Sequence, residues 1–284
     1  LGFNAEFSHP KNMIIECLSI PPPVIRPSVC MESCLQSQDD LTHKLIDIIK
    51  SNIQLGKVID NENSNQNSID ENLRHLYLAG GEPFYLKNFP STVERIWKKA
   101  PNAKIAINTN GTRLLREKDL AKLRHIKGIK IRLSVDGWGP AEEYTRQDTV
   151  WEEKLAVMDQ YYKEFGVQVW DITANPLNVR HLPKLIEFLW ENYPNSKIQV
   201  RPVINKYEIM MDNIPAHFKQ ESLDFFIKHK EKLEGVDHVI HEMQKPHNED
   251  ENKRKSMKRF VNYYDTHGAL TLDSFDPKLA EWIN

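Results

Sequence analysis

The chain has 284 residues and a formal net charge of −2 at pH 7. This length suffices for one large α/β domain or two ordinary domains, each able to bury a substantial core. The nearly balanced charge excludes a general basic field that would attract nucleic acid or a membrane surface. No apolar run approaches the roughly 20 residues needed to cross a bilayer, so we expect no membrane partner.

The cysteine content indicates a reducing compartment. Cys17, Cys30 and Cys34 are the only cysteines, too few for a disulfide framework. The first twelve residues lack the charged and apolar regions of a signal peptide. We therefore expect a cytoplasmic protein, in a cell or in the cytoplasm of a virus-infected host. The chain begins with Leu1 rather than Met, as a fragment of a longer protein would.

We expect residues 1–59 to form a small irregular α+β segment. The apolar run at residues 13–20 predicts a short strand, which the three prolines at 21–23 must end because proline lacks a backbone donor. Asp39 or Asp40 is placed to cap a following helix. The apolar face of that helix would consist of Leu41, Leu45, Ile48 and Ile49.

Residues 60–72, DNENSNQNSIDEN, are almost wholly polar and include five asparagines. Such a stretch cannot bury enough surface to offset the entropy that it would lose on ordering. We predict a linker here, between a first domain at residues 1–59 and a second at 73–284. The alternative is a long surface loop inside a single domain.

After this linker, strand and helix patterns alternate. Ser91 and Glu94 form a candidate capping box for a first helix, and apolar residues recur at helical spacing over 151–165 and 182–189. Strands separated by helices in this way predict βαβ units and a parallel sheet or barrel. The predicted strands are residues 75–79, 104–108, 129–135, 167–173 and 197–203.

Four of these strands run into polar turns: GGEP (80–83), NTNGT (108–112), SVDGWGP (134–140) and TANPLN (173–178). Glycine lets backbone amides approach a ligand closely, and Asn, Ser, Thr and Asp supply hydrogen-bonding groups. Each motif alone is typical of an ordinary turn. Ligands of parallel α/β folds bind at the carboxyl ends of strands, so we expect the four turns to line a pocket at one edge.

Three of the motifs carry a resemblance to a family: Gly80-Gly81-Glu82-Pro83, Asn110-Gly111-Thr112 and Ser134-Val135-Asp136-Gly137 follow successive strands, with Arg146 ten positions after Asp136. In this order they resemble the radical S-adenosylmethionine (SAM) superfamily. The C-terminal stretch FVNYYDTHGALTLDSFDPKLAEWIN resembles the end of its "twitch" members. The resemblance covers residues 73–284 and implies an α/β fold, a partial (β/α) barrel whose first strand and cluster loop are missing or replaced.

The resemblance also implies a SAM site. The backbone of residues 80–82 would hold the methionine amino group, Ser134 would lie near the ribose or the carboxylate, and Arg146 would pair with the carboxylate. Without the resemblance, Arg146 would be interpreted as an exposed arginine at a helix start, and Glu82 as a turn carboxylate. The cofactor-binding residues implied are Gly80, Gly81, Glu82, Pro83, Asn110, Ser134, Asp136 and Arg146, with Thr173, Asn175 and Arg201 near the adenine.

Radical SAM proteins hold a [4Fe–4S] cluster through three cysteine thiolates in a CxxxCxxC motif. Reduction of SAM by that cluster gives a 5′-deoxyadenosyl radical. The matching spacing here is CMESCLQS, in which Cys30 and Cys34 are followed by Ser37. A serine hydroxyl is far harder to deprotonate than a thiol, so Ser37 is a poor iron ligand.

Upstream, the blocks PPPVIRPSV and DDLTHKLIDIIK occur in order with a short gap between them. Residues 2–55 thereby resemble the largest subunit of DNA-dependent RNA polymerase, of the eukaryotic or large DNA virus type. Cys30 and Cys34 fall in the gap, so we interpret CxxxCxxS as coincidental; a degenerate metal site at Cys30, Cys34 and Ser37 is the alternative. The magnesium-binding NADFDGD loop of that subunit is absent from the chain, so we expect no nucleotide polymerisation.

Together these patterns predict a chimera of two families. The main functional hypothesis is a radical SAM-type barrel, inactive because its cluster cysteines are incomplete. One alternative is a structural fragment of the polymerase subunit, which would meet nucleic acid only within a polymerase. A second is a barrel that binds a nucleotide without redox chemistry. The family suggests a small-molecule or peptide substrate, and the sequence does not identify it.

Overall fold

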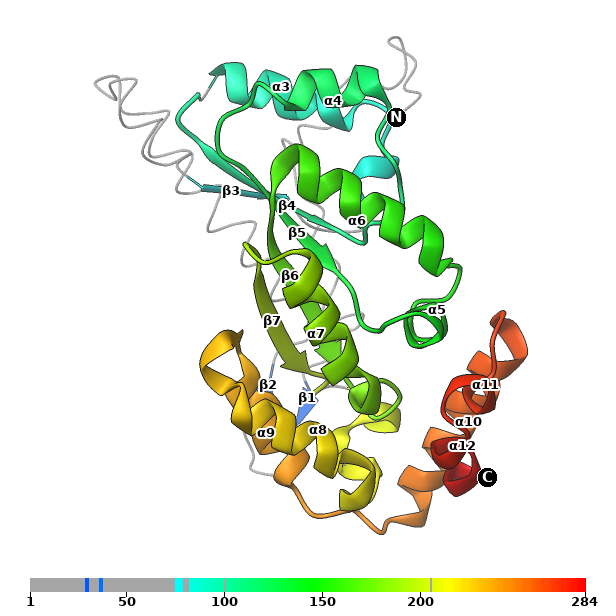
Figure 1. Ribbon diagram of the computed structural model, residues 1–284. Coiled ribbons are helices and arrows are strands. Elements are labelled where there is room, and N and C mark those ends of the chain that lie inside the picture. The colour runs from blue at the N-terminus through cyan, green and yellow to red at the C-terminus, as the bar shows by residue number, and fades with distance from the viewer. Residues whose placement is uncertain (1–28, 31–35, 38–74, 79–81, 100, 205) are drawn as a thin grey trace. The chain divides into compact units, whose positions relative to one another are not determined.

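The computed structural model describes residues 29–30, 36–37, 75–78, 82–99, 101–204 and 206–284 (Figure 1). The chain divides into two compact units, Leu1–Arg74 and His75–Asn284. In the first unit the described residues form an antiparallel pair, β1 (Val29–Cys30) with β2 (Gln36–Ser37). The strand expected at 13–20, the helix expected after residue 40 and the linker at 60–72 lie outside the described residues.

The second unit is built on a six-stranded parallel sheet in which each strand neighbours the one before it in sequence. The five predicted strands are confirmed, with ends that differ by at most one residue. The sixth was not predicted because two residues carry no alternating pattern. In the described part of the chain the sheet is open, as a partial barrel requires. The strands are β3 (His75–Leu78), β4 (Lys104–Thr109), β5 (Ile129–Ser134), β6 (Val167–Ala174), β7 (Lys197–Pro202) and β8 (Leu233–Glu234).

Helices connect the first five of these strands, and Figure 1 shows α6 and α7 on the same side of the sheet. Right-handed crossovers between strands in sequential order place their helices on one face. The helical patterns at 151–165 and 182–189 are confirmed. The connecting helices are η3 (Pro83–Tyr85), α3 (Phe89–Lys99), α4 (Glu117–Leu123), α5 (Pro140–Thr145), α6 (Trp151–Phe165), η4 (Val179–His181) and α7 (Leu182–Asn192).

The capping box expected at Ser91 and Glu94 is wrong. Helix α3 begins at Phe89, so Ser91 lies inside its first turn. Pro90 explains the earlier start, because proline is well suited to the first turn of a helix, where no backbone donor is needed. The Ser91 hydroxyl instead accepts a hydrogen bond from Lys122 at 2.7 Å.

The core lies between the sheet and its helices. Ile105, Ile107, Ile131 and Leu133 on β4 and β5 are 0% exposed. They alternate with less buried residues along each strand. Since successive side chains of a strand point to opposite faces, the sheet has one apolar face covered by helices and one polar face.

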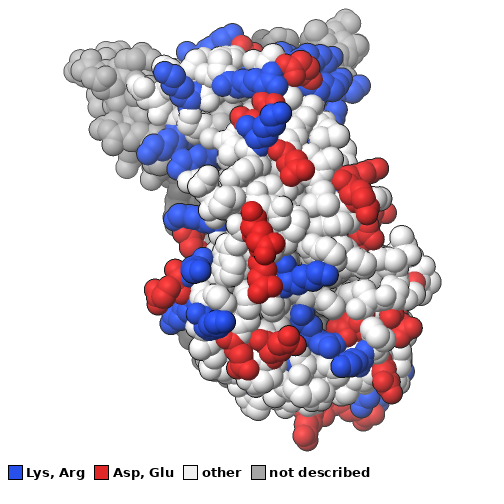
Figure 2. Space-filling model, in the orientation of Figure 1, with Lys and Arg blue, Asp and Glu red and all other residues white. Residues whose placement is uncertain are grey.

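The chain after β7 is mainly helical. Tyr144 of α5 donates a hydrogen bond to Asp265 at 2.9 Å, and its ring lies 4.9 Å from that of Phe275, which fixes this region to the connecting helices. No helix in the described ranges is long and apolar enough to span a membrane. Figure 2 shows basic and acidic side chains interspersed over the visible face of the molecule. The remaining helices are η5 (Tyr207–Ile209), η6 (Met211–Asn213), α8 (Ala216–Lys228), η7 (Lys230–Lys232), α9 (Val236–Gln244), α10 (Glu251–His267), α11 (Leu272–Phe275) and α12 (Pro277–Ile283).

Candidate functional site

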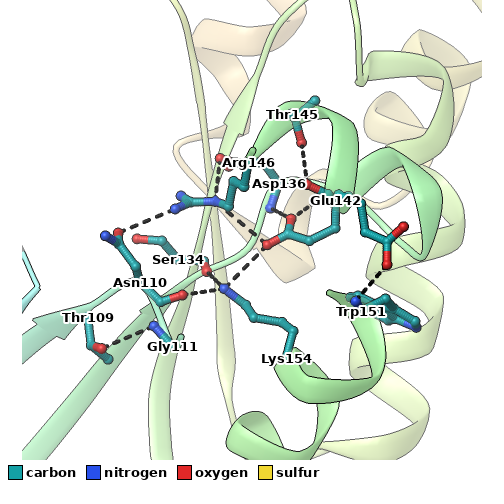
Figure 3. A network of polar contacts seen from close by, with 12 residues as sticks. Thr109, Asn110, Gly111, Ser134, Asp136, Glu142, Thr145, Arg146, Trp151 and Lys154 are labelled. Atoms are coloured by element: carbon teal, nitrogen blue, oxygen red, sulfur yellow. Dashed lines mark hydrogen bonds and ion pairs between the residues drawn. The ribbon is translucent and has the colours of Figure 1, made fainter. Parts of the chain in front are cut away.

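The carboxyl ends of β3 to β7 lie along one edge of the sheet, because these strands are parallel and adjacent. We call this the carboxyl edge. The turns that follow β3, β4, β5 and β6 contain most of the residues selected from the sequence. Figure 3 shows the polar contacts among several of them.

Glu82 joins the first turn to the second. Its carboxylate accepts hydrogen bonds from the Phe84 amide at 3.1 Å, from the Asn110 amide at 2.6 Å and from the Thr109 hydroxyl at 2.8 Å. Pro83 begins η3. The side chain of Glu82 therefore holds the turns after β3 and β4 together. Gly80 and Gly81 lie outside the described residues.

Asp136 lies at the centre of the carboxyl edge and is 8% exposed. Its Oδ1 accepts a hydrogen bond from the Thr173 amide at 2.6 Å, and its Oδ2 lies 2.9 Å from Nε of Arg146. Nη1 of Arg146 donates to the side-chain oxygen of Asn110 at 3.3 Å (Figure 3). The structure thus brings together four selected residues: Asn110, Asp136, Arg146 and Thr173.

Two buried charges that the sequence analysis missed support this centre. Glu142 of α5 is 0% exposed, and its Oε2 accepts hydrogen bonds from the amides of Asp136 at 2.6 Å and Gly137 at 2.9 Å. Lys154 of α6 is 1% exposed, and its Nζ lies 3.3 Å from Oε1 of Glu142. Lys154 also donates to the carbonyl oxygens of Asn110 and, at 2.9 Å, Ser134 (Figure 3). It therefore ties the ends of β4 and β5 to α5.

Burial shifts both charges toward their neutral forms. It raises the pKa of Glu142 above its ordinary value, although Lys154 and Arg146 lower that pKa. It lowers the pKa of Lys154, although Glu142 raises that pKa. Oε1 of Glu142 and Nε of Arg146 are buried and form ion-pair contacts, but no hydrogen bond, with described residues.

Asn178, also missed, organises the turn after β6. It is 0% exposed, and its Nδ2 donates to the carbonyls of Asp136 at 2.9 Å and Thr173 at 2.8 Å. Its Oδ1 accepts from the Asn175 amide, and the Asn175 side chain in turn accepts from the Leu177 amide, both at 2.8 Å. No sequence signal separates Asn178 from Asn175, because both are ordinary turn residues.

Ser134 and Arg201 lie at the margin of this network. No hydrogen bond joins the Ser134 hydroxyl to another described residue, and Arg201 is exposed on β7, where it donates to Gln199 at 2.7 Å. A small recess opens beside the network. Only one of the four turns predicted to line a pocket, the turn after β4, contributes to this recess. The recess is lined by Gly111, Thr112, Asp148, Thr149, Val150, Glu153 and Lys154.

Two family models match the chain. The model described as RNA polymerase Rpb1, domain 1, matches residues 1–79, and the model of the radical SAM superfamily matches residues 65–189. The chain is a chimera of the two. The resemblances to the polymerase subunit and to the radical SAM superfamily are both confirmed, with different extents, whereas the resemblance of the C-terminal stretch to twitch members stays a prediction. The Rpb1-like segment (1–79) continues past residue 55, and the radical SAM-like segment (65–189) ends within α7, so the two overlap at residues 65–79.

The Rpb1-like segment is similar to archaeal and eukaryotic polymerase subunits. It is 47% identical over 60 residues to the DNA-directed RNA polymerase subunit Rpo1N of Sulfolobus acidocaldarius, a match that covers 21% of this chain and 7% of that protein. It is 42% identical over 76 residues to the DNA-directed RNA polymerase II subunit RPB1 of Euplotoides octocarinatus, covering 27% of this chain and 15% of that protein. The chain therefore spans a small part of these relatives.

Solved structures with partial similarity include SuiB of Streptococcus suis bound to S-adenosylmethionine. The TM-score is 0.42 at 16% identity, covering 56% of this chain and 36% of SuiB. Native anSMEcpe with bound AdoMet and Cp18Cys peptide has a TM-score of 0.43 at 19% identity, covering 55% of this chain and 47% of anSMEcpe.

The donor set of this chimera does not fit a [4Fe–4S] cluster. Cys30, Cys34 and Ser37 supply two thiols and an alcohol, where the radical SAM motif supplies three thiolates. The register of β1 and β2 pairs Cys30 with Gln36 and Val29 with Ser37, and Cys34 lies outside the described residues. In the described ranges no group of three His, Cys, Asp or Glu residues could hold a metal ion.

Proposed function

We propose that the carboxyl edge of the radical SAM-like segment binds SAM weakly and that this chain does not cleave it. The observation that carries the proposal is the convergence of Asn110, Asp136, Arg146 and Thr173, from four separate elements, on one centre. The match of residues 65–189 to the radical SAM superfamily supports it, because the match contains this whole centre.

The residues at the centre suit the polar groups of SAM. Arg146 Nη2 has no hydrogen bond to a described residue, so it could receive the SAM carboxylate. The Ser134 hydroxyl would serve the ribose or the same carboxylate. The backbone of residues 80–82 would hold the amino group, while Thr173, Asn175 and Arg201 would lie near the adenine.

Reductive cleavage is not expected, because a [4Fe–4S] cluster would both supply the electron and hold the amino and carboxylate groups of SAM. Two thiols and a serine cannot replace three thiolates at neutral pH. The chain's own groups remain to bind SAM, and we expect a dissociation constant of about 0.1–1 mM.

Isothermal titration calorimetry of the full chain with SAM tests the binding. Arg146→Met should weaken it about tenfold, since a charge-assisted hydrogen bond is lost. Arg259→Met is the matched control, because Arg259 is exposed on α10 and should not affect SAM. Tighter binding of ATP than of SAM would instead support the nucleotide-binding alternative.

The cleavage claim needs a separate assay. After anaerobic reconstitution with iron and sulfide, the chain should retain no stoichiometric cluster and should release no 5′-deoxyadenosine under dithionite. Ser37→Cys completes the CxxxCxxC motif and should raise the iron retained. Cleavage by the unaltered chain at the rate of an intact family member would refute this part of the proposal.

A second candidate function is a structural role of the Rpb1-like segment in transcription, which its 42–47% identity to polymerase subunits favours. The segment would act only within a polymerase, since it lacks the NADFDGD loop. Binding of the full chain to a purified polymerase core that lacks its own Rpb1 domain 1 would support this role, and failure to bind would exclude it.

A further inference from the structure

Helix α10 carries a concentration of positive charge that the chain as a whole lacks. Residues 253–259 include five basic side chains and no acidic one, although the formal net charge of the chain is −2. Such a run is found on ordinary solvated helix faces and also on surfaces that bind nucleic acid. The placement of the side chains around the helix separates these two interpretations.

Four of the five basic side chains are accessible from outside the protein. Lys253 is buried in an ion pair, whereas Arg254, Lys255 and Arg259 are exposed and Lys258 is half-buried. A helix advances about 6 Å in four residues, so Lys255 and Arg259 lie one turn apart on the same side. Two cations in this arrangement can contact neighbouring phosphates of one extended strand.

The existing contacts leave both of these cations available. Lys255 lies 2.9 Å from Glu251, but the two side chains are 62% and 77% exposed, so water screens the pair and a phosphate could replace the carboxylate. Arg259 donates to Ser256 at 3.2 Å through Nη2 alone, and its Nε and Nη1 form no hydrogen bond with a described residue. The basic side chains at 254 and 258 donate to carbonyl oxygens near the end of α12.

An aromatic pair continues the same side of the helix. Tyr263 follows Arg259 by one turn and is 58% exposed. Its ring stacks on that of His267, with centroids 4.2 Å apart and 25° between the ring planes. The stacking holds the tyrosine in one orientation while more than half of its surface meets solvent. An unpaired base can stack on such a ring, whereas a base inside a duplex cannot reach it.

The apolar side of α10 argues against a membrane partner. A helix that binds a membrane interface inserts its apolar face, but Met257 and Val261 are 0% and 2% exposed because they pack in the core. An acidic peptide would pair with the cations and leave the aromatic ring unused. A single-stranded nucleic acid would use both the cations and the ring.

We propose that the exposed side of α10 binds a single-stranded nucleic acid, with phosphates at Lys255 and Arg259 and a base on Tyr263. The exposed acids Glu249 and Asp250 precede the helix and repel phosphates, so the strand extends toward the C-terminal half of α10. The proposal goes beyond SAM binding and is independent of it, because none of these residues is assigned to SAM.

Fluorescence anisotropy of the full chain at low ionic strength tests the proposal. The probes are labelled oligo(dT) and oligo(U) of equal length, and the same oligo(dT) paired with oligo(dA). We expect both single strands to bind more tightly than the duplex. The logarithm of the binding constant should fall against the logarithm of the salt concentration with a slope of about −1.4, from two phosphate contacts. Tighter binding of oligo(U) would identify RNA, and of oligo(dT) DNA; both support the proposal.

Variants separate the two contributions. Tyr263→Ala should weaken binding about tenfold, whereas Tyr263→Phe, which keeps the ring, should bind as the unaltered chain does. Lys255→Gln combined with Arg259→Gln should also weaken binding and bring the salt slope close to zero. The controls are Tyr85→Ala, since Tyr85 is 59% exposed on η3, and Lys197→Gln, since Lys197 is an exposed, acid-paired lysine on β7.

Three results would overturn the proposal. The first is tighter binding of the duplex than of either single strand. The second is unchanged binding in Tyr263→Ala or in the double variant, or an equal loss in the two controls. The third is tighter binding of labelled polyglutamate or of phosphatidylserine vesicles than of the single strands, which would assign the surface to an acidic peptide or to a membrane.

Discussion

At the scale of single residues, the buried ion pair of Lys154 and Glu142 joins α6 to α5 and supports the turn that contains Asp136. Neither of its members was selected from the sequence, whereas acids next to glycines were. Glu82 and Asp136 were selected because a lone acid next to glycine is conspicuous at a strand end. Lys154 follows two other charged residues on α6, Glu152 and Glu153, which are both exposed. All three residues are charged and count equally as polar in a hydrophobic-periodicity analysis. Nothing in the sequence therefore showed that Lys154 is buried while Glu152 and Glu153 are exposed.

Replacing Lys154 tests how much the buried centre stabilises the fold. Lys154→Met leaves Glu142 buried without its nearest cation and removes the donor of the Asn110 and Ser134 carbonyls. We expect a loss of about 3–5 kcal/mol in the free energy of unfolding, the usual cost of breaking a buried ion pair. Urea unfolding followed by circular dichroism measures this loss.

The matched control is Lys255→Met on α10. Lys255 lies 2.9 Å from Glu251, but the two side chains are 62% and 77% exposed. Water screens such a pair, so its loss should cost at most about 0.5 kcal/mol. Similar losses for the two variants would show that the buried charges contribute no more than surface charges do.

Gly137 provides a second test at this scale. A Cβ atom there would lie 2.4 Å from the Glu142 nitrogen and 2.5 Å from the Ala141 carbonyl carbon, both backbone atoms that cannot rotate away. Gly137→Ala should therefore lower the melting temperature and cost about 3 kcal/mol or more, at the upper end of overpacking effects.

Gly166→Ala is the comparison for Gly137→Ala, because it introduces backbone strain without a steric clash of the new Cβ atom. Gly166 has a φ of +68° and a ψ of 107°, with open space around its Cβ position, so an alanine there should cost about 1–3 kcal/mol through backbone strain alone. A larger loss at Gly166 than at Gly137 would contradict the account of the Asp136 turn.

At the scale of elements, the strands were predictable because apolar runs at intervals of about 30 residues leave few topologies open. The ends of helices were less predictable than the strands. Ser91 resembles an N-cap residue, yet α3 begins two residues earlier, at Phe89, because Pro90 is suited to the first helical turn. The short strand β8 pairs with β7 through two residues, Leu233 and Glu234. Its position is set by tertiary packing, which a local pattern does not record.

The start of α12 gives a prediction with pH as the variable. Burial raises the pKa of Asp276. Hydrogen bonds from His181 and the Leu279 amide, together with the charge of Arg180, lower that pKa by more, so it lies below its ordinary value. The carboxylate contribution is therefore complete above the unfolded pKa of about 3.9 and is lost as the pH falls through the folded value.

Asp276→Asn should consequently destabilise the chain at pH 7, and its deficit relative to the unaltered chain should shrink as the pH falls below about 4. Urea unfolding at pH 7, 5 and 3.5 measures both curves. Asp224→Asn is the control, since Asp224 on α8 accepts one exposed hydrogen bond from Gln220. A deficit that is constant over this pH range would mean that the Asp276 charge does not contribute.

At the scale of the whole molecule, the chimera predicts independent behaviour of its two parts. Limited proteolysis of the full chain should cut first between Asp60 and Asn72, because that stretch is polar and the two sequences come from unrelated families. Mass spectrometry should then find residues from about 73 onward as a stable product.

The loop at residues 245–250 between α9 and α10, most of which is exposed, serves as the internal comparison. First cleavage there, with residues 60–72 intact, would show that the Rpb1-like segment is integrated with the sheet. In that event CMESCLQS should be reconsidered as a degenerate cluster loop.

The sequential order of the strands has a consequence for how the molecule folds and tolerates rearrangement. Each strand pairs with the one just before it in sequence, so the sheet can grow by addition of neighbouring units and no pairing from β3 to β8 spans more than one connection. A foreign segment joined ahead of β3 can disturb one edge and leaves the pairings from β3 to β8 unchanged. Recombination ahead of the edge strand β3 therefore leaves the rest of the sheet intact. An equal insertion between β5 and β6 would separate two paired strands in the middle of the sheet.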